Sequence, residues 1–361
     1  MTVLVTGAAG FIGSNLVRHL RARWPDRSIV SFDALTYAGN PENLAALQHD
    51  ELHHFVRGDV RDAEAVAAVF DAHDVQVVFH LAAESHVDRS IMGPMDFVTT
   101  NVVGTATLLH AARGAWDGDT ERRFVHVSTD EVFGSLGATG AFSESTPYDP
   151  RSPYSASKAA SDHLARAWGH TYGVPVLVTN CTNNYGPYQF PEKLVPVVIT
   201  RALEQREVPI YGDGLQVRDW LHVEDHCDAL ALVAERGTPS ETYCIGGEAE
   251  VANLHLVHAL LDAVDAELGR PTGHSRGLIR HVADRPGHDR RYAMDISHIR
   301  DSLGWTPTRA FEDGMRQTVR WYLDNSEWVA RAVSGESRQF ESLWYDGRGN
   351  HDPSSARTND D

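Results

Sequence analysis

The chain has 361 residues, of which 42% are hydrophobic, enough to bury a sizeable core in one large domain or two. Its formal net charge of −18 argues against a protein that binds nucleic acid through its phosphates, because no basic stripe is present to neutralise them. No apolar run approaches the roughly 20 residues that span a bilayer, and the three cysteines are too few and too scattered for a disulfide framework or a metal site.

Short apolar runs alternate with helical patterns through the first half of the chain, which is typical of β-α-β units on a parallel sheet. The first run starts at Thr2, so a signal peptide has no room and we expect a cytoplasmic protein. The pattern predicts a Rossmann-type, doubly wound α/β fold, and the sixth strand is expected to close the sheet. Strands are expected at 2–6, 28–33, 53–56, 75–81, 123–128 and 174–180, with helices at 11–23, 63–72, 99–113 and 155–172.

The regular alternation ends near Cys181, and a mixed pattern of short strands, loops and helices follows. Residues 1–180 are therefore assigned to a dinucleotide-binding domain. Residues 181–346 are assigned mainly to a smaller mixed α/β domain for the substrate, with some later segments returning to the first domain. Residues 347–361 are polar and rich in Gly, Pro and Ser, so we expect a disordered tail. The later helices are expected at 194–204, 223–236, 253–267 and 311–325.

A glycine-rich turn follows the first strand and opens the first helix. Gly7, Gly10 and Gly13 have the spacing Gly-x-x-Gly-x-x-Gly, which lets backbone N–H groups approach a pyrophosphate at the helix N-terminus. Asp33 ends the second strand, where a carboxylate accepts hydrogen bonds from an adenosine ribose and repels a 2′-phosphate, so NAD is favoured over NADP. Asp59, after the third strand, either lies at the adenine edge or caps a turn.

Tyr154 and Lys158 stand four residues apart, so both project from one helical face. The adjacent ammonium and a positively charged nicotinamide would lower the pKa of the phenol and favour the phenolate, which can act as a base. The alternative is a surface pair on an amphipathic helix. Only two of the 32 basic residues are lysines, Lys158 and Lys193, and both fall in motifs, which favours the functional interpretation.

These features together resemble the extended short-chain dehydrogenase/reductases. The glycine turn, Asp33 and the Tyr154–Lys158 pair match that family's pattern, and the match runs from Thr2 to about Tyr345. The resemblance implies that Tyr154 is the general base for a sugar hydroxyl and that Lys158 binds the nicotinamide ribose. It implies NAD contacts with Gly7, Gly10, Phe11, Ile12, Gly13, Asp33, Asp59, Val60, Leu81, Ala82, Ala83, Asn101, Tyr154 and Lys158.

Two adjacent acids, Asp130 and Glu131, follow the fifth strand. Buried acids are costly unless function retains them, although turn chemistry is an alternative. The pair is similar to that of the family's nucleotide-sugar 4,6-dehydratases, whereas its epimerases have small uncharged residues there. The resemblance implies that a hydride leaves C4 for NAD and returns to C6, so that the net reaction is loss of water. Glu131 would remove the C5 proton, Asp130 would protonate the leaving C6 hydroxyl, and Thr129 would hydrogen-bond O4.

The substrate implied by this resemblance is a nucleotide-diphosphate sugar, dTDP-glucose. Residues 180–194 are similar to the substrate loop of the dehydratases. Arg218 and Arg285 stand in Gly/Pro-rich stretches where a guanidinium fork suits a diphosphate, and surface ion pairs are the alternative for both. The substrate contacts implied are Ser85, Asn183, Glu192, Lys193, Leu194, Arg218, Asn253, Arg285, His288 and Tyr345.

Two other functions stay open from the residues. A 4-epimerase acting on a UDP-sugar would release no ketosugar, and a non-catalytic NAD-sensing scaffold would bind NAD without turning over any sugar nucleotide. The resemblance also implies a homodimer formed through 99–113 and 155–172. His222 and His226 have helical i, i+4 spacing, but no further ligand cluster accompanies them, so we expect a helix-start or packing role and no metal.

Overall fold

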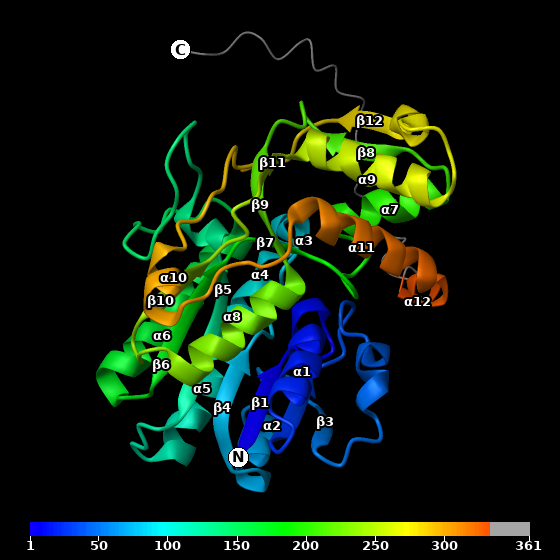
Figure 1. Ribbon diagram of the computed structural model, residues 1–361. Helices are drawn as coiled ribbons and strands as arrows, with labels where there is room; N and C mark the ends of the chain where they lie inside the picture. Colours follow the sequence, from blue (N-terminus) through cyan, green and yellow to red (C-terminus); the bar gives the residue numbers. More distant parts are fainter. Residues whose placement is uncertain (333–361) are drawn as a thin grey trace.

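A seven-stranded parallel sheet forms the centre of the computed structural model, which describes residues 1–332 (Figure 1). Neighbouring strands follow the order β10-β6-β5-β4-β1-β2-β3. The chain changes direction across the sheet between β1 and β4, which is the point where doubly wound sheets bind ligands. The strands span Thr2–Thr6 (β1), Ser28–Asp33 (β2), His53–Arg57 (β3), Val75–His80 (β4), Arg123–Thr129 (β5), Val176–Cys181 (β6) and Thr242–Ile245 (β10).

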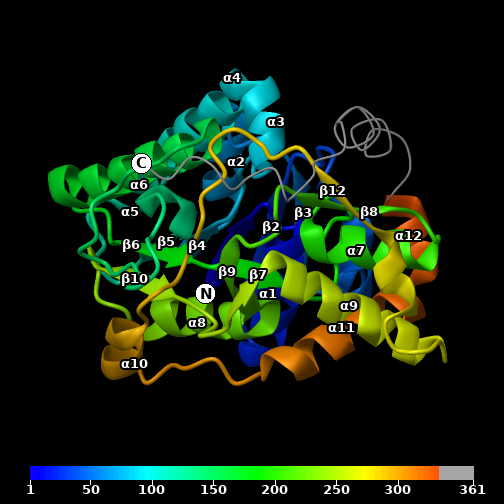
Figure 2. The ribbon, with the colours of Figure 1, turned by 90° about the horizontal axis from the view of Figure 1, so that it is seen from above.

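Helices cover both faces of this sheet, because successive side chains of its buried strands point to opposite faces. Val3 and Val5 of β1 belong to the core beneath α1 and α8, whereas Leu4 between them belongs to the core beneath α2, α5 and α6. Figure 2 shows the sheet between these two helical layers. On the first face lie α1 (Phe11–Arg23), α8 (Val223–Arg236) and α10 (Ser297–Leu303); on the second lie α2 (Ala63–Ala72), α5 (Gly104–Trp116) and α6 (Pro153–Tyr172).

Short helical segments connect these elements. Two short helices, α3 (Val87–Met92) and α4 (Pro94–Phe97), lead into the π-helical turn η2 (Val98–Val103), which continues into α5. The 3₁₀ turns are η1 (Pro41–Leu47), η3 (Asp130–Phe133) and η4 (His274–Leu278).

A smaller α/β unit lies above the carboxyl edge of the main sheet (Figure 1). It contains a three-stranded sheet, β11-β9-β7, and a two-stranded sheet, β12-β8, which pack with helices around a core of their own. The strands are β7 (Asn183–Tyr185), β8 (Val208–Tyr211), β9 (Val217–His222), β11 (Glu250–Ala252) and β12 (Ile279–Val282); the helices are α7 (Leu194–Leu203), α9 (Asn253–Glu267), α11 (Phe311–Asp324) and α12 (Ser326–Ala332).

The predicted doubly wound fold is confirmed, but the expectation that the sixth strand closes the sheet is wrong. Strand β10 pairs with β6 in parallel and forms the edge beyond it. Helix α8, which precedes β10, packs against α1 on the main sheet. The four residues of β10 are too few to show a strand pattern in the sequence. Within residues 1–332, no helix combines the length and the apolar character that a membrane crossing requires.

Candidate active site

A cavity of about 510 Å³ opens at the carboxyl edge of the main sheet, beside the switch point between β1 and β4. Most of the residues predicted for cofactor and catalysis line it. They are Gly7, Gly10, Phe11, Ile12, Gly13, Asp33, Asp59, Val60, Leu81, Ala82, Ala83, Thr129, Glu131, Tyr154 and Lys158, together with the predicted substrate residues Ser85, Asn183, Glu192 and Lys193. Asn101, Asp130, Leu194, Arg218, Asn253, Arg285 and His288 lie outside its wall, and Tyr345 falls outside the described residues.

The glycine turn forms one end of the cavity in a shape that suits a dinucleotide. Gly7 has φ +66°, in the left-handed region. A Cβ at Gly13 would lie 2.1 Å from the Gly7 carbonyl oxygen, so helix α1 starts directly against the turn. Gly10, the residue that precedes α1, makes no side-chain cap, and the first turn contains no acid. The free N–H groups of this helix end are therefore available to a pyrophosphate.

Two aspartates lie along the same part of the cavity wall. Asp33 Oδ2 accepts a hydrogen bond from the Ala9 N–H at 2.9 Å, and Oδ1 accepts one from the Leu35 N–H at 2.8 Å. A carboxylate has about four acceptor positions, so Asp33 can hold the turn and still accept from a ribose. Asp59 accepts a hydrogen bond from the Arg61 N–H at 2.8 Å and pairs with the Arg61 guanidinium at 2.6 Å. These contacts are the ones that the turn-capping alternative predicts.

The Asn101 side chain does not line the cavity and hydrogen-bonds within the protein. Its Oδ1 accepts from the Glu84 N–H at 2.8 Å, and its Nδ2 donates to the Glu84 carbonyl at 3.0 Å and to Ser157 Oγ at 2.8 Å. The π-helical turn η2 presents this side chain. Asn101 therefore fixes the segment after β4 against α6, and its contact with NAD stays a prediction.

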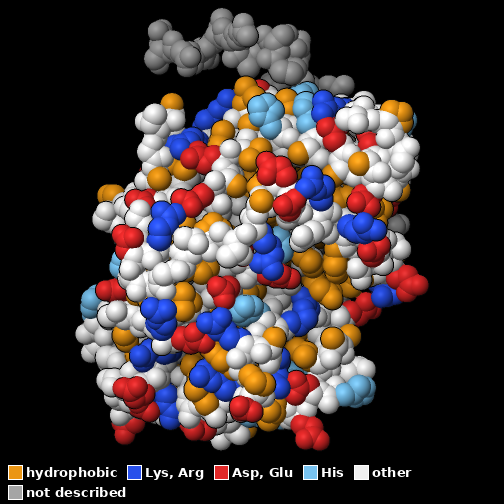
Figure 3. All heavy atoms as spheres, in the orientation of Figure 1, with side chains coloured by type: hydrophobic (Ala, Val, Ile, Leu, Met, Phe, Trp, Pro, Cys, Tyr) orange, Lys and Arg blue, Asp and Glu red, His pale blue; other side chains and the backbone are white. Residues whose placement is uncertain are grey.

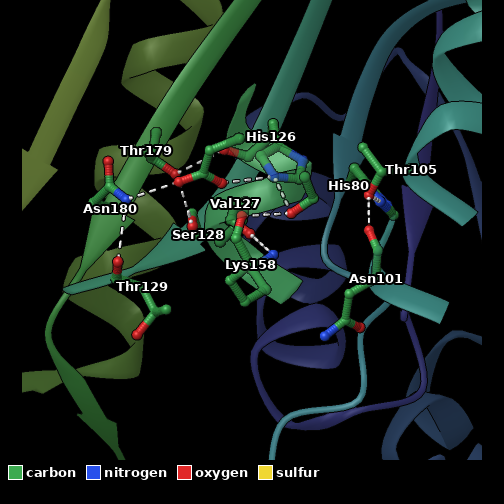
Figure 4. A network of polar contacts seen from close by, with 12 residues as sticks. His80, Asn101, Thr105, His126, Val127, Ser128, Thr129, Lys158, Thr179 and Asn180 are labelled. Atoms are coloured by element: carbon green, nitrogen blue, oxygen red, sulfur yellow. Dashed lines mark hydrogen bonds and ion pairs between the residues drawn. The ribbon is translucent and has the colours of Figure 1, made fainter. Parts of the chain in front are cut away.

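Helix α6 carries Tyr154 and Lys158, and local sequence defines its start and its end. Ser152 and Ser155 form a capping box, with Pro153 in the first turn, and the left-handed Gly173 ends the helix. Tyr154 and Lys158 are both buried and both line the cavity, which contradicts the surface-pair alternative. Lys158 Nζ donates to the Val127 carbonyl oxygen at 2.9 Å (Figure 4).

The predicted lowering of the Tyr154 pKa depends on the positive charge of a bound nicotinamide, and for the NAD-bound enzyme it stays a prediction. Burial of the phenol and the nearby Glu131 raise the pKa of Tyr154 well above its usual value, and the hydrogen bond with Thr129 only partly opposes them. The Lys158 ammonium is directed at a carbonyl of β5. Desolvation of the phenol therefore has a larger effect on the Tyr154 pKa than the expected effect of the Lys158 charge.

Asp130 and Glu131 follow β5 in η3, whose start is capped by Thr129 Oγ1, which accepts from the Glu131 N–H at 3.3 Å. Asp130 is 2% exposed; its Oδ1 accepts from Thr129 Oγ1 at 3.2 Å, and its Oδ2 has no hydrogen-bond partner among the described residues. Burial and the adjacent Glu131 raise the pKa of Asp130 well above its usual value. Burial also raises the pKa of Glu131, but three nearby cations oppose this: Arg285, Arg218 and Lys193. The two carboxyls thus have different environments, which suits an acid beside a base.

Arg218 and Arg285 are not surface ion pairs. Arg218 is 5% exposed, donates to the carbonyls of Val217 and Asp289, and lies 4.2 Å from the centre of the Tyr292 ring. Arg285 pairs with the buried Asp88 at 3.3 Å. Since both guanidinium groups act on Glu131, they lie near the catalytic side of the cavity, although they do not line it.

The remaining predicted substrate residues surround this region. Lys193 Nζ donates to the Ser85 carbonyl at 2.9 Å, and Glu192 pairs with Arg89 at 3.1 Å. His288 Nδ1 lies 2.6 Å from Asp284. Leu194 and Asn253 begin α7 and α9, and Asn183 begins β7. The Asn253 side-chain oxygen is buried and has no hydrogen-bond partner within residues 1–332.

The two histidines with helical spacing have structural roles. His222 caps α8, because its Nδ1 accepts from the Glu224 N–H at 3.2 Å, and His226 Nδ1 lies 2.9 Å from Asn184 Oδ1. The helix-start interpretation is confirmed. Within residues 1–332, no group of His, Cys, Asp and Glu side chains could hold a metal ion.

Known proteins share this arrangement over nearly the whole chain. The family model described as GDP-mannose 4,6 dehydratase matches residues 4–318. A dTDP-glucose 4,6-dehydratase of Xanthomonas campestris pv. campestris is 54% identical over 343 residues, which cover 93% of this chain and 97% of that protein. This chain belongs to the dTDP-glucose 4,6-dehydratase family.

Two further dTDP-glucose 4,6-dehydratases agree with this assignment. That of Escherichia coli (strain K12) is 51% identical over 362 residues, covering 96% of this chain and all of that protein. The crystal structure of the Streptomyces venezuelae enzyme, with NAD and TYD bound, has a TM-score of 0.85 and 48% identity, and it covers 92% of this chain and 100% of that chain.

Two buried acids of this dehydratase family member escaped the sequence analysis. Asp88 contacts Tyr211 and Arg285, which follow it by 123 and 197 positions, so no local pattern points to it. Asp162 lies four residues after Lys158 on α6, and this helical spacing could have shown that both side chains share a face.

Proposed function

We propose that this chain converts dTDP-glucose to dTDP-4-keto-6-deoxyglucose, with NAD as its cofactor. The observation that carries the proposal is the placement of Thr129, Glu131, Tyr154 and Lys158 around one cavity that ends on the glycine turn. Epimerases of the family need no acid pair after β5. A scaffold that only senses NAD needs neither that pair nor a buried Tyr154–Lys158 pair.

The first chemical task belongs to Tyr154. NAD, when bound, would accept a hydride from C4 of the sugar and return it to C6, while a proton returns to C5. Tyr154 takes the proton from O4, and Thr129, which lowers the pKa of the phenol, steadies the charge that develops there. Lys158 supplies a buried ammonium beside this step, with one N–H held by Val127.

The second task is the loss of water across C5 and C6. A 4-keto group acidifies the C5–H bond, and Glu131, in the cavity wall, removes that proton. Asp130 protonates the leaving C6 hydroxyl; burial raises the pKa of Asp130 and so favours the protonated form that this step needs. The opposing cations around Glu131 leave it easier to ionise than its neighbour.

Substrate binding requires cations in an acidic protein. On the face drawn in Figure 3, basic side chains are interspersed with acidic ones and form no stripe. The buried Arg218 and the half-buried Arg285 are the groups that we assign to the diphosphate, with Lys193 at the cavity wall. Because Lys193, Arg218 and Arg285 all lie within residues 181–346, we assign this part of the chain mainly to substrate binding.

The decisive experiment incubates the protein with dTDP-glucose and with UDP-glucose and follows the absorbance of the ketosugar in alkali. We expect a signal with dTDP-glucose, and no signal with either sugar nucleotide would overturn the proposal. The variant Glu131→Gln should lose about 10²–10⁴-fold in turnover, because it removes a general base. Glu121→Gln, at an exposed acid, is the matched control and should keep full activity. An epimerase would survive both substitutions.

We also propose a homodimer and a cytoplasmic location. Support for the homodimer comes from apolar side chains exposed on α3, α4, η2 and α6: Met92, Met95, Val98, Val103 and Tyr172. Analytical ultracentrifugation of the wild type and of Met95→Glu tests it, and a monomeric wild type would contradict it. The three cysteines are free thiols, in keeping with a reducing compartment. Cell fractionation tests the location.

A further inference from the structure

Asp162 lies on α6 one turn beyond Lys158 and two turns beyond Tyr154, so the three side chains share one face of the helix. Its side chain is completely buried. Four side chains from β5, β6 and the loop before α6 contact its carboxylate. They are His126 Nε2 at 3.0 Å, Ser128 Oγ at 2.9 Å, Tyr148 Oη at 2.8 Å and Asn180 Nδ2 at 3.3 Å.

This carboxylate is ionised although it is buried. Burial raises the pKa of Asp162, but His126, Lys158 and Ser128 together lower it by more than burial raises it. The pKa of Asp162 therefore lies below its usual value. Burial lowers the pKa of His126, so that its imidazole is neutral at neutral pH. The four contacting groups therefore satisfy the hydrogen bonding of the carboxylate without cancelling its charge, and a buried charge requires a counter-charge.

Lys158 is the buried cation on the same helix face. Burial lowers the pKa of Lys158, and Asp162 raises it. Cys181 also faces this ammonium, but burial raises the pKa of its thiol to about 12, so it carries no charge. Among the described residues, Asp162 is the ionised acid that acts on Lys158.

We propose that Asp162 is a positioning residue for the reaction, the fixed counter-ion that holds Lys158 as an ammonium directed at the Val127 carbonyl and the cavity. An ammonium has three N–H donors. One of them is used by Val127, and the other two are left for a ligand in the cavity that Lys158 lines. Figure 4 shows the labelled side chains His126, Ser128 and Asn180 gathered on one side of β5, with Lys158 directed at Val127.

The other ionisable groups around the pair cannot replace Asp162. His80 of β4, whose imidazole faces His126 and Lys158, has a pKa lowered well below its usual value by burial, so it is neutral. Arg166, further along α6, reaches Asp162 only through Tyr148, whose hydroxyl accepts from Arg166 Nη2 at 2.8 Å. Tyr148 itself stays protonated, because burial raises its pKa.

The first test is the pH dependence of kcat/KM for the holoenzyme with dTDP-glucose. In Asp162→Asn the counter-ion is lost, so Lys158 loses its proton at lower pH, and we expect the ratio of kcat/KM at about pH 9 to that at about pH 7 to fall about tenfold or more. Asp162→Glu keeps the charge and should keep the wild-type ratio. Tyr148→Phe removes one hydrogen bond and no charge, and it should also keep the ratio. An unchanged ratio in a folded Asp162→Asn protein would overturn the inference.

The second test uses no turnover, and it stays decisive where Asp162→Asn is poorly folded. Lys158→Met, Asp162→Asn and the double variant are compared by thermal unfolding without substrate. If the two charges compensate each other, the double variant loses less melting temperature than the two single losses combined. Strict additivity would overturn the inference. The role of Lys158 in the reaction rests on the proposed function, whereas this thermal-unfolding cycle does not. A failure of the proposed function can therefore be told apart from a failure of the inference about Asp162.

Discussion

The substitution Gly13→Ala is expected to damage NAD binding and stability together. A Cβ at this position would lie 2.1 Å from the Gly7 carbonyl oxygen, 2.8 Å from the Gly7 carbonyl carbon and 2.9 Å from Ala8 Cα. All three atoms are backbone, so no side chain can rotate away. Reaching an ordinary contact of 3.4 Å requires the first turn of α1 and the glycine turn to separate by more than an ångström.

Overpacking of this kind costs about 1–3 kcal/mol, which exceeds the roughly 0.5–1 kcal/mol that alanine gains over glycine inside a helix. The separation also moves the N–H groups that are assigned to the pyrophosphate. If this overpacking free energy destabilises only the NAD-bound state, the NAD affinity drops by about 5- to 150-fold.

Gly114→Ala is the matched control, because Gly114 is exposed on α5 and a Cβ there meets no atom within 4 Å. The same chemical change should raise stability by about 0.5–1 kcal/mol. Thermal unfolding of both variants and calorimetric titration of the apoprotein with NAD give the two measurements. A Gly13→Ala protein that melts as high as the wild type and binds NAD equally well would refute the steric reasoning.

Three further substitutions test separate parts of the site. Asp130→Asn should raise the melting temperature, with a gain that grows as the pH rises above the usual carboxyl pKa of about 4, because the unfolded chain then releases a proton that the buried carboxyl, with its raised pKa, retains. Calorimetry showing a pH-independent gain would contradict this. His222→Ala removes the α8 cap and should cost about 1 kcal/mol in urea unfolding. Since burial lowers the pKa of His222 to about 4 whereas the unfolded chain titrates near 6.5, that cost should be largest at about pH 8 and should shrink as the pH falls through about 6.5, because the unfolded state then binds a proton that the folded state does not. Asp88→Asn releases Arg285 and should raise KM for dTDP-glucose about tenfold while kcat changes little, and an unchanged KM would remove Asp88 from substrate binding.

The sequence predicted the main sheet well because parallel strands are buried on both faces and read as continuous apolar runs. Strand β5 was expected at 123–128 and spans Arg123–Thr129, and β6 was expected at 174–180 and spans Val176–Cys181. The glycine turn and the Tyr154–Lys158 pair were equally accessible, since each depends on local spacing. Strand β10 was missed because its four residues carry too little pattern.

What the sequence could not predict at the site has a different origin. Whether Tyr154 has a raised or lowered pKa depends on a competition between burial and charge, and the sequence reveals neither the depth of the phenol nor the direction of the Lys158 ammonium. Asn101 was placed at the cofactor for its position in a motif, but its amide meets Glu84 and Ser157, which only the folded chain brings together.

Cations and their partners connect these outcomes. Lys158 lies near Asp162 and Arg285 pairs with Asp88, two acids that the sequence did not reveal, and Lys193 donates to the Ser85 carbonyl. A low-dielectric site tolerates such charges only when a counter-charge or oriented dipoles accompany them. A cation found in a sequence motif therefore indicates that compensating groups lie nearby, but only the folded structure shows which residues they are. A chain with a net charge of −18 contains many acidic residues. Their abundance therefore does not identify those that act at the site, and their burial does.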